Sequence, residues 1–417
     1  MSTTLAATWY IASQYEQYRL NALERFNNQT GSTQLSHTIS DRNLFNHNEH
    51  YRISAYADGS NKLVELQFNQ QVKFYPGFVK ATYSIDTSSP SWQVVGQQLK
   101  QPLLNHGSWS ASIFSQQGNY RYQVDGFESK PTSLDEYIST GDIVVDGTFA
   151  LDLSEYSSQL SIAAATIGFA QRVFELEGLS ASSTMTLLDD IYDINFSHSS
   201  IDSLTAYQLG NTTTATKPLR FKLNDLKLSN GNLHRQGNSS SSTTLTIGAL
   251  ALSANDDIDI TLTDARLATK VSNVATSAYI NLARFIQQGS QPDALASALT
   301  DIDTILANNL QLDIQAFEGD ITLASRDEKI AGHYAAIGQI VLHPTNLAQL
   351  QTSQPFALID AKLSLNFSDT MFSQHPLATQ LDNFEQHGFL NRADGQFTTS
   401  VIFENAQLSL NDQPLQL

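Results

Sequence analysis

The sequence predicts an α+β fold in which extended antiparallel β-sheets carry an N-terminal helix and a pair of helices packed on the sheet face. Most of the 417-residue chain alternates between apolar and polar residues, the period of a half-buried strand. Helical periodicity, with apolar residues three or four positions apart, occurs near the N-terminus and again at residues 271–306. A chain of this length exceeds one ordinary hydrophobic core, so we expect more than one domain.

The first helix is expected over residues 10–27, because one face of this segment is apolar or aromatic. The residues of that face are Ile11, Tyr15, Tyr18, Ala22 and Phe26. The apolar run at residues 5–12 contains Trp9 and Tyr10, a pair that suits a membrane interface. Residues 1–30 are therefore interpreted as a helix that follows a membrane anchor whose inner part is missing. The alternative is a surface helix capped by Ser2 or Thr3.

Two sheet-rich parts are expected after this helix, an antiparallel β domain at 31–160 and an α+β domain at 161–417. The boundary is placed where the strands of the first part give way to residues 161–168. In the second part, residues 257–262 alternate strictly between polar and aliphatic side chains, as in a sheet with one solvated face. The Ser- and Thr-rich segment at 237–244 is predicted to form a flexible hairpin tip.

The last thirty residues predict a terminal hairpin. Alternation at residues 399–403 is followed by a polar break at 404–405 and by a second short strand at 406–410. We expect Phe397, Val401 and Phe403 to pair with Leu408 and Leu410. Asn411 is expected to contribute only local turn hydrogen bonds.

Composition excludes several kinds of function. The formal charge is −18, from 23 basic and 41 acidic residues, so neither nucleic acid nor an anionic membrane surface is an expected partner. The chain has no cysteine, which excludes disulfides, thiolate chemistry and Cys-ligated zinc. Charged residues are only 15% of the chain, and neutral polar residues supply its solubility, a pattern more typical of exported β-proteins.

The C-terminal segment resembles the YdgA-like bacterial envelope proteins, the domain-of-unknown-function family number 945. The resemblance rests on the pattern Gly…Asp-Gly…strand…Leu-x-Leu-Asn-Gly-x-Pro, on which Asp394-Gly395, Leu408, Leu410, Asn411 and Pro414 fall, with Asp412 in place of the usual glycine. It implies a periplasmic protein, anchored to the inner membrane in its native form, that has no known enzymatic activity. By the same analogy it implies a homo-oligomer.

The segment His47-Asn48-Glu49-His50 is the best candidate for a metal site, because two histidines and a carboxylate lie within four residues. The spacing is not that of a zincin helix, and strand signals follow at Tyr51. Residues i and i+3 of a strand point to opposite faces, so we interpret the segment as a polar loop before a strand.

Two acidic clusters are interpreted as solvated turns, since neither has the glycine-centred spacing of a calcium loop. They are Asp189-Asp190 with Asp193, and Asp256-Asp257 with Asp259. His333 and His343 are interpreted as structural residues at strand ends. No residue is therefore assigned a catalytic, cofactor-binding or metal-binding role.

Two functions remain open. The preferred one is a non-catalytic envelope protein that works through protein contacts or self-association. The alternative is a carrier or sensor of a lipid or other apolar ligand, held between sheet and helices, because the apolar stripes could enclose a groove. An enzyme ranks third.

Overall fold

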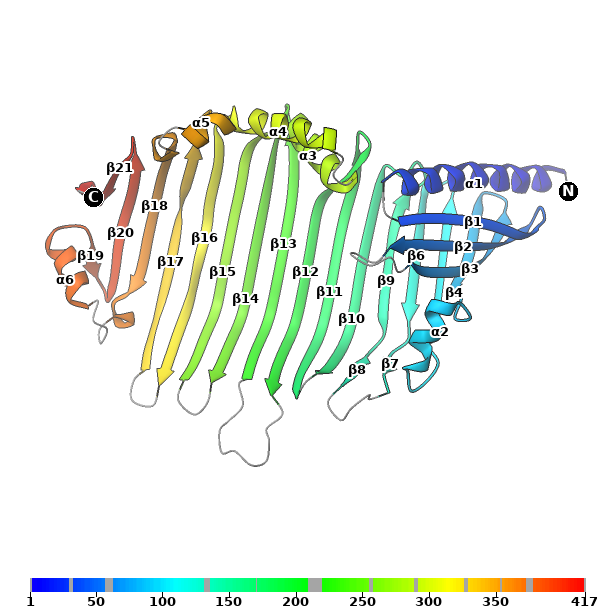
Figure 1. Ribbon diagram of the computed structural model, residues 1–417, viewed down its shortest axis with the longest axis horizontal. Helices are drawn as coiled ribbons and strands as arrows, with labels where there is room; N and C mark the ends of the chain where they lie inside the picture. The colour runs from blue at the N-terminus through cyan, green and yellow to red at the C-terminus, as the bar shows by residue number, and fades with distance from the viewer. Residues whose placement is uncertain are drawn as a thin grey trace. The chain divides into compact units, whose positions relative to one another are not determined.

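The computed structural model describes most of the chain. The described residues are 2–29, 33–56, 63–130, 136–169, 171–208, 220–254, 258–288, 292–325, 329–352, 355–372 and 378–415. Within them the protein is an α+β structure dominated by antiparallel sheet, as the sequence predicts (Figure 1). None of the described helices is both long enough and apolar enough to cross a membrane.

The chain divides into two compact units. Unit 1 comprises residues 1–170, 177–195 and 284–290, and unit 2 comprises 171–176, 196–283 and 291–417. Residues 161–168, where the sequence places a boundary, lie within one strand, β10. The domain limits at 30 and 160 stay predictions.

Unit 1 is an antiparallel meander with a helix packed on it. Its strands pair in the order β1-β2-β3-β4-β5-β6-β9-β10, and β7 pairs with β8, which also pairs with β10. The elements are α1 (Ser2–Gln29), β1 (Thr33–Arg42), β2 (Asn46–Tyr56), β3 (Leu63–Tyr75), β4 (Phe78–Ile85), α2 (Pro90–Gln97), β5 (Asn105–Ser112), β6 (Gln117–Val124), β7 (Phe127–Glu128), β8 (Tyr137–Thr140), β9 (Ile143–Ala150) and β10 (Glu155–Phe169).

Helix α1 is the expected N-terminal helix, and it packs against β1, β3 and β4. Its predicted apolar face is the face turned to the sheet. Ile11 is 3% exposed and packs in a core with Val72, Phe74, Val79 and Ala81. The chain begins its strands where the helical period ends, so the sequence pattern and the packing agree in this unit.

Unit 2 is also antiparallel, and its longest strands have 18 residues. The order is β12-β13-β14-β15-β16-β17-β18-β20-β21-β22, with β19 also on β20. The elements, of which β11, β12 and α3 also contribute residues to unit 1, are β11 (Arg172–Leu188), β12 (Ile191–Gln208), β13 (Arg220–Arg235), β14 (Asn238–Ala254), β15 (Ile258–Ala275), α3 (Thr276–Gln288), α4 (Pro292–Leu306), β16 (Leu310–Ser325), β17 (Lys329–Leu342), α5 (Leu347–Thr352), η1 (Pro355–Leu358), β18 (Ile359–Ser368), η2 (Asp369–Met371), α6 (Ala378–Gln386), β19 (Asn391–Ala393), β20 (Gln396–Glu404), β21 (Gln407–Leu410) and β22 (Gln413–Leu415).

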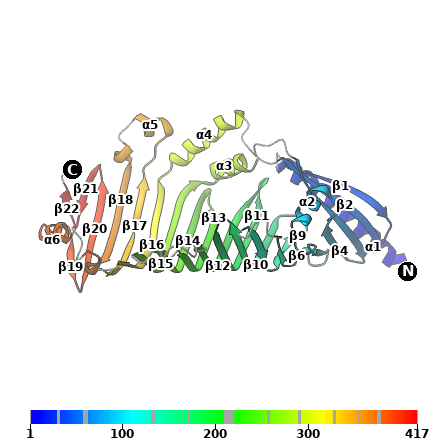
Figure 2. The same ribbon diagram turned by 60° about the horizontal axis from the view of Figure 1, so that its bottom comes forward.

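The helix-period residues 271–306 are helical only in part. Residues up to Ala275 continue β15, and the two helices α3 and α4 follow. Helix α4 packs against β15 and α5, and both views place α4 and α5 at one end of the long strands (Figures 1 and 2).

The prediction of a flexible tip at residues 237–244 is wrong. Gln236 and Gly237 form the turn, both with positive φ, and β14 begins at Asn238. Such a two-residue turn matches the twist of a hairpin. The hydroxyl-rich residues that follow belong to the strand, where Ser239 is 4% exposed and donates a hydrogen bond to Thr276.

A row of irregular residues crosses three neighbouring strands of unit 2. Asp225 and Asp264 have φ values of 51° and 50°, and the register places Gly248 between them. A Cβ on Gly248 would lie 2.8 Å from the Cβ of Asp225, so glycine is required here. In a regular strand, side chains on the same face are two residues apart. Across this row the aliphatic residues are three apart instead, as Leu223 and Leu226 are.

The terminal hairpin is confirmed in its pairing. Val401 lies opposite Leu410 and Phe403 opposite Leu408. The expectation for Phe397 is wrong, because its ring packs on Phe367 of β18 instead of on the last strand.

The role of Asn411 is also not the local one that we expected. Its Oδ1 accepts a hydrogen bond from the Ser400 amide at 2.8 Å, and its Nδ2 donates to the Phe389 carbonyl at 3.1 Å. Asn411 has a φ of 46°, a conformation that asparagine tolerates better than most residues.

We therefore predict that Asn411→Ala destabilises unit 2 by about 2–3 kcal/mol, through lost hydrogen bonds to partly buried backbone and a less favourable left-handed conformation. Asn405→Ala is the matched control. Asn405 also has a positive φ, of 53°, but its side chain makes no hydrogen bond within the described chain. Calorimetric melting of both variants measures the difference. Equal losses would show that the hydrogen bonds of Asn411 contribute nothing.

Candidate functional site

The candidate site lies where helix α1 packs on the sheet of unit 1. A cavity of about 590 Å³ opens there, lined by one face of α1 and by residues of β1 to β6, β9 and β10. Aromatic and aliphatic side chains make up most of the wall. They are Ile11, Tyr15, Tyr18, Ala22, Leu23, Phe26, Leu35, Tyr51, Ile53, Phe68, Phe78, Val79, Tyr83, Trp109, Ala111, Ile113, Tyr120, Phe149, Leu151, Leu153 and Tyr156.

The period of two in β2 places a polar group against this apolar wall. His47, Glu49, Tyr51 and Ile53 occupy alternate positions of the strand and therefore share a face. Glu49 has a side chain that is 0% exposed, and that of His47 is 4% exposed. A carboxylate at a core position needs hydrogen-bond partners, because burial of an unpaired charge is very unfavourable.

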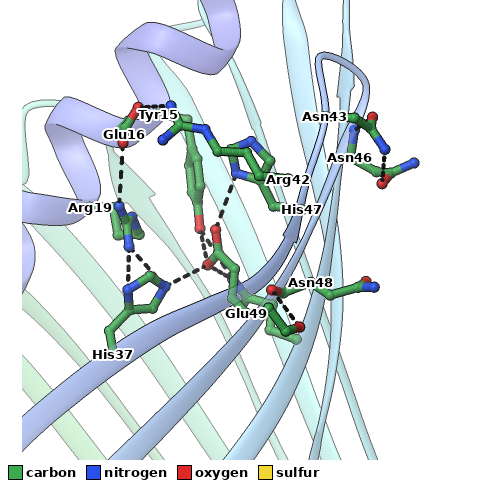
Figure 3. A network of polar contacts seen from close by, with 12 residues as sticks. Tyr15, Glu16, Arg19, His37, Arg42, Asn43, Asn46, His47, Asn48 and Glu49 are labelled. Carbon is green, nitrogen blue, oxygen red and sulfur yellow. Dashed lines mark hydrogen bonds and ion pairs between the residues drawn. The ribbon is translucent and has the colours of Figure 1, made fainter.

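Glu49 finds these partners on four elements, one of which is its own strand (Figure 3). Its Oε2 accepts hydrogen bonds from the hydroxyls of Tyr15 in α1 at 2.7 Å and of Tyr51 at 2.8 Å. The Gln70 amide of β3 donates to the same oxygen at 3.1 Å, and His37 Nε2 of β1 lies 3.4 Å away. The carboxylate thus joins α1 to the first three strands.

The second oxygen, Glu49 Oε1, is buried without a hydrogen bond from any described residue, as is His47 Nδ1 at 3.6 Å from it. Burial raises the pKa of Glu49, but hydrogen bonds from His37, Tyr15 and Tyr51 outweigh that effect, so the pKa is lowered overall. Burial lowers the pKa of His47, although the Glu49 carboxylate opposes this effect. Glu49 is thus charged and His47 neutral at pH 7.

Arg19 of α1 lies on the other side of His37. Its Nη1 contacts both ring nitrogens, at 2.8 Å from Nε2 and closer to Nδ1. The side chain of Arg19 is 8% exposed, it lines the cavity, and its Nε is buried without a hydrogen bond to the described part of the chain. The nearest described carboxylate is that of Glu16, at 3.9 Å.

Tyrosines extend the aromatic wall away from this network. The Tyr83 ring stacks on Tyr122, and the Tyr120 ring stacks on Tyr156. Burial raises the pKa of Tyr83 to about 12, so this hydroxyl stays neutral throughout the physiological range. Trp109 stacks on Tyr15 and donates a hydrogen bond to Gln70 at 3.0 Å.

The structure separates the two histidines of the metal hypothesis. His47 and His50 lie within β2 rather than in a loop before it. His50 lies on the face of the strand opposite to His47, and its Nδ1 is 2.7 Å from Asn69 Oδ1. Among the described residues, no group of three or more His, Asp or Glu is placed to hold a metal ion. Glu49, which the sequence places merely between two histidines, is the residue on which the site is built.

The residues of the two predicted acidic clusters do not all lie in solvated turns. Asp189 and Asp190 form the turn between β11 and β12, as predicted, and Arg284 pairs with Asp190 at 2.5 Å. Asp193 is not in that turn but is buried in β12. Asp259 is exposed in β15, and Asp256-Asp257 lie outside the described residues.

The two histidines interpreted as structural residues at strand ends pair with carboxylates of neighbouring strands. His333 Nδ1 lies 3.0 Å from Asp320, and His343 Nε2 lies 2.7 Å from Asp360.

The sequence missed the polar role of Tyr15 and Arg19, because both fit an amphipathic helix without further explanation. A signal existed at Glu49, since it occupies a position in β2 whose i+2 and i+4 neighbours are Tyr51 and Ile53. An acidic residue on the apolar face of a strand indicates a buried network.

Comparison with known proteins adds no further constraint: no protein-family model, curated protein or solved structure matches this chain. The likeness to the YdgA-like family therefore stays a prediction.

Loss of the Glu49 carboxylate should release the helix. In Glu49→Ala, the hydroxyls of Tyr15 and Tyr51 and the Gln70 amide lose their acceptor, which we expect to cost about 3–5 kcal/mol. Hydrogen exchange should then accelerate in α1 before it does in β3. Glu65→Ala is the control, since Glu65 is partly exposed and lies 3.8 Å from Arg52. Unchanged protection of α1 in Glu49→Ala would contradict the anchoring role.

Stability should also fall as the pH decreases below about 6.5. Folded His47 has a pKa below the ordinary value of 6.5, so protons bind more readily to the unfolded chain in that window. Glu49 adds to the loss only at more acidic pH, below its ordinary value of 4.5, because its folded pKa is also lowered.

In His47→Gln, the decline in the free energy of unfolding between pH 7.5 and 5.5 should be shallower, by up to about 1.4 kcal/mol per pH unit. Urea unfolding at each pH measures this slope. Parallel slopes in wild type and His47→Gln would disprove this assignment.

Proposed function

We propose that the protein binds a lipid or other apolar ligand in the cavity between helix α1 and the sheet of unit 1. The observation that carries this proposal is the cavity itself, about 590 Å³ with a predominantly aromatic and aliphatic wall. That volume lies within the range of small-molecule sites, roughly 300–1,000 Å³. A few convergent polar groups at Arg19 and Gln70 complete the usual composition of such a site.

The cavity has two walls. One is formed by the strands of unit 1, and the other is formed by the single helix α1. Most strands of the wall are paired on both sides, whereas α1 is held by its packed face and by side-chain bonds from Tyr15, Glu16, Arg19 and Asn27. Movement of α1 is the natural route of entry, because it opens the cavity without breaking a strand pairing. The chain then acts as a carrier or sensor, without catalysis, and we place it in the periplasm of a bacterial envelope.

A second candidate is the self-association that the sequence favours. It is supported by rows of aliphatic residues that the register aligns across unit 2. One row is Leu204, Leu223, Leu250, Leu262 and Ile321. We further infer that the α3–α4 pair packs on this face, since Tyr279 contacts Asn232 at 2.9 Å. The part of this face that the helix pair does not cover would then contact a second copy.

Native mass spectrometry of the full chain, purified without detergent, separates the two candidates. Ligand binding predicts a monomer carrying a stoichiometric apolar adduct. A ligand-free dimer would instead support self-association and contradict the carrier.

A cavity-filling variant tests the location. Ala111 lines the cavity, and Ala111→Phe should reduce binding of an alkyl probe such as 1-dodecanol at least tenfold by occupying its space. Ala164→Phe, at an exposed position of β10 away from the cavity, is the matched control. Equal binding by both variants would place the ligand elsewhere.

A further inference from the structure

Arg19 is a buried cation that has no carboxylate at hydrogen-bond distance among the described residues. Glu16 lies 3.9 Å from it, is 31% exposed, and makes a closer pair at 2.5 Å with Arg42. His37 contacts Arg19 but carries no negative charge in any protonation state found in proteins. Glu49 is engaged with Tyr15, Tyr51, Gln70 and His37 on the far side of that ring.

Arg19 has an N–H group without a partner in the described chain. Its Nε is buried without a hydrogen bond to any residue that the structure describes, and Arg19 is one of the residues that line the cavity. No lysine and no other arginine occurs among the described lining residues. A planar guanidinium offers two parallel N–H groups, a fork that matches the two oxygens of a carboxylate.

From this geometry we propose that the ligand is a single-chain amphiphile with a carboxylate head, such as a fatty acid, and that Arg19 receives the head. This inference rests on the proposed function, because it assigns the head group of the ligand that the cavity holds. One cation suits a monoanionic head, whereas a phosphomonoester would place a second negative charge beside Glu49 with no further cation in the described wall to balance it. The apolar wall accepts the chain.

Helix α1 offers wall on both sides of the head group. The lining residues run from Ile11 to Phe26, and Arg19 lies between them. At 1.5 Å per residue, the wall extends roughly 10–12 Å from Arg19 in each direction along the helix. The head thus binds at the middle of the helix, beside the Glu49 network, and the chain follows the aromatic wall.

Isothermal titration calorimetry of the full chain with dodecanoate and with 1-dodecanol at pH 8 tests the proposal. The probes share a chain and differ in the head. Wild-type protein should bind dodecanoate at least tenfold more tightly than dodecanol. In Arg19→Met, the affinity for dodecanoate should fall to that for dodecanol, while the affinity for dodecanol stays within twofold of the wild-type value. Retained dodecanol binding also shows that the variant is folded.

Arg42→Met is the matched control, because Arg42 is 57% exposed and does not line the cavity, and it should keep the preference for dodecanoate. Equal affinity of wild type for both probes would overturn the carboxylate assignment while leaving ligand binding intact. An unchanged preference in Arg19→Met would overturn the role of Arg19. Absence of binding by either probe would overturn the proposed function itself.

Discussion

The burial of one carboxylate governs the architecture of the candidate site. Glu49 is 0% exposed on its side chain, and it is stable there because donors from α1, β1, β2 and β3 converge on it. Each donor also fixes the position of its own element, so the network sets where the helix lies on the sheet. A fully apolar interface would hold α1 by area alone and would specify its register less sharply.

The same network borders the cavity in which we propose that a ligand binds. Tyr15 and Trp109 stack on each other and both line the cavity, while their polar groups donate to Glu49 and Gln70 of the network. Arg19 lines the cavity and contacts His37 of the network, and its Nε makes no hydrogen bond within the described chain. An apolar wall with one cation at its edge is complementary to an amphiphile, because the chain and the head each find a matching environment.

Much of the fold could be predicted from the sequence, because local periods determine it. The spacing of Ile11, Tyr15 and Tyr18 indicated both the helix and the face that it buries. Strict alternation indicated antiparallel strands, and the pairing of the last hairpin followed from it. Failures arose where non-local contacts override local signals. Residues 237–244 look like a flexible tip, yet they pair along the ladder, and Asn411 bonds to Ser400 and Phe389 rather than within its turn.

The candidate site was predicted far less well, since it depends on which strand faces meet beneath α1. The segment His47–His50 drew attention as a metal motif, but strand geometry points its two histidines to opposite faces. The sequence predicts an apolar groove between the strands and two apolar-faced helices, whereas the cavity that the structure shows lies between the strands of unit 1 and the single helix α1. The residues next to Arg19 and Gln70 in the sequence do not reveal their roles. Arg19 contacts His37, 18 residues away, and Gln70 accepts a hydrogen bond from Trp109, 39 residues away.

Fluorescence of Trp109 offers the most direct measurement of the central claim, that an apolar chain occupies the cavity under α1. A bromine-labelled alkanoate quenches an indole only at close range, and Trp109 lines the cavity, whereas Trp9 is 63% exposed. We expect saturable quenching in the wild-type chain that is lost in Trp109→Phe, while Trp9 and Trp92 continue to emit. Quenching of equal size in both proteins would place the alkyl chain outside the cavity and contradict that claim.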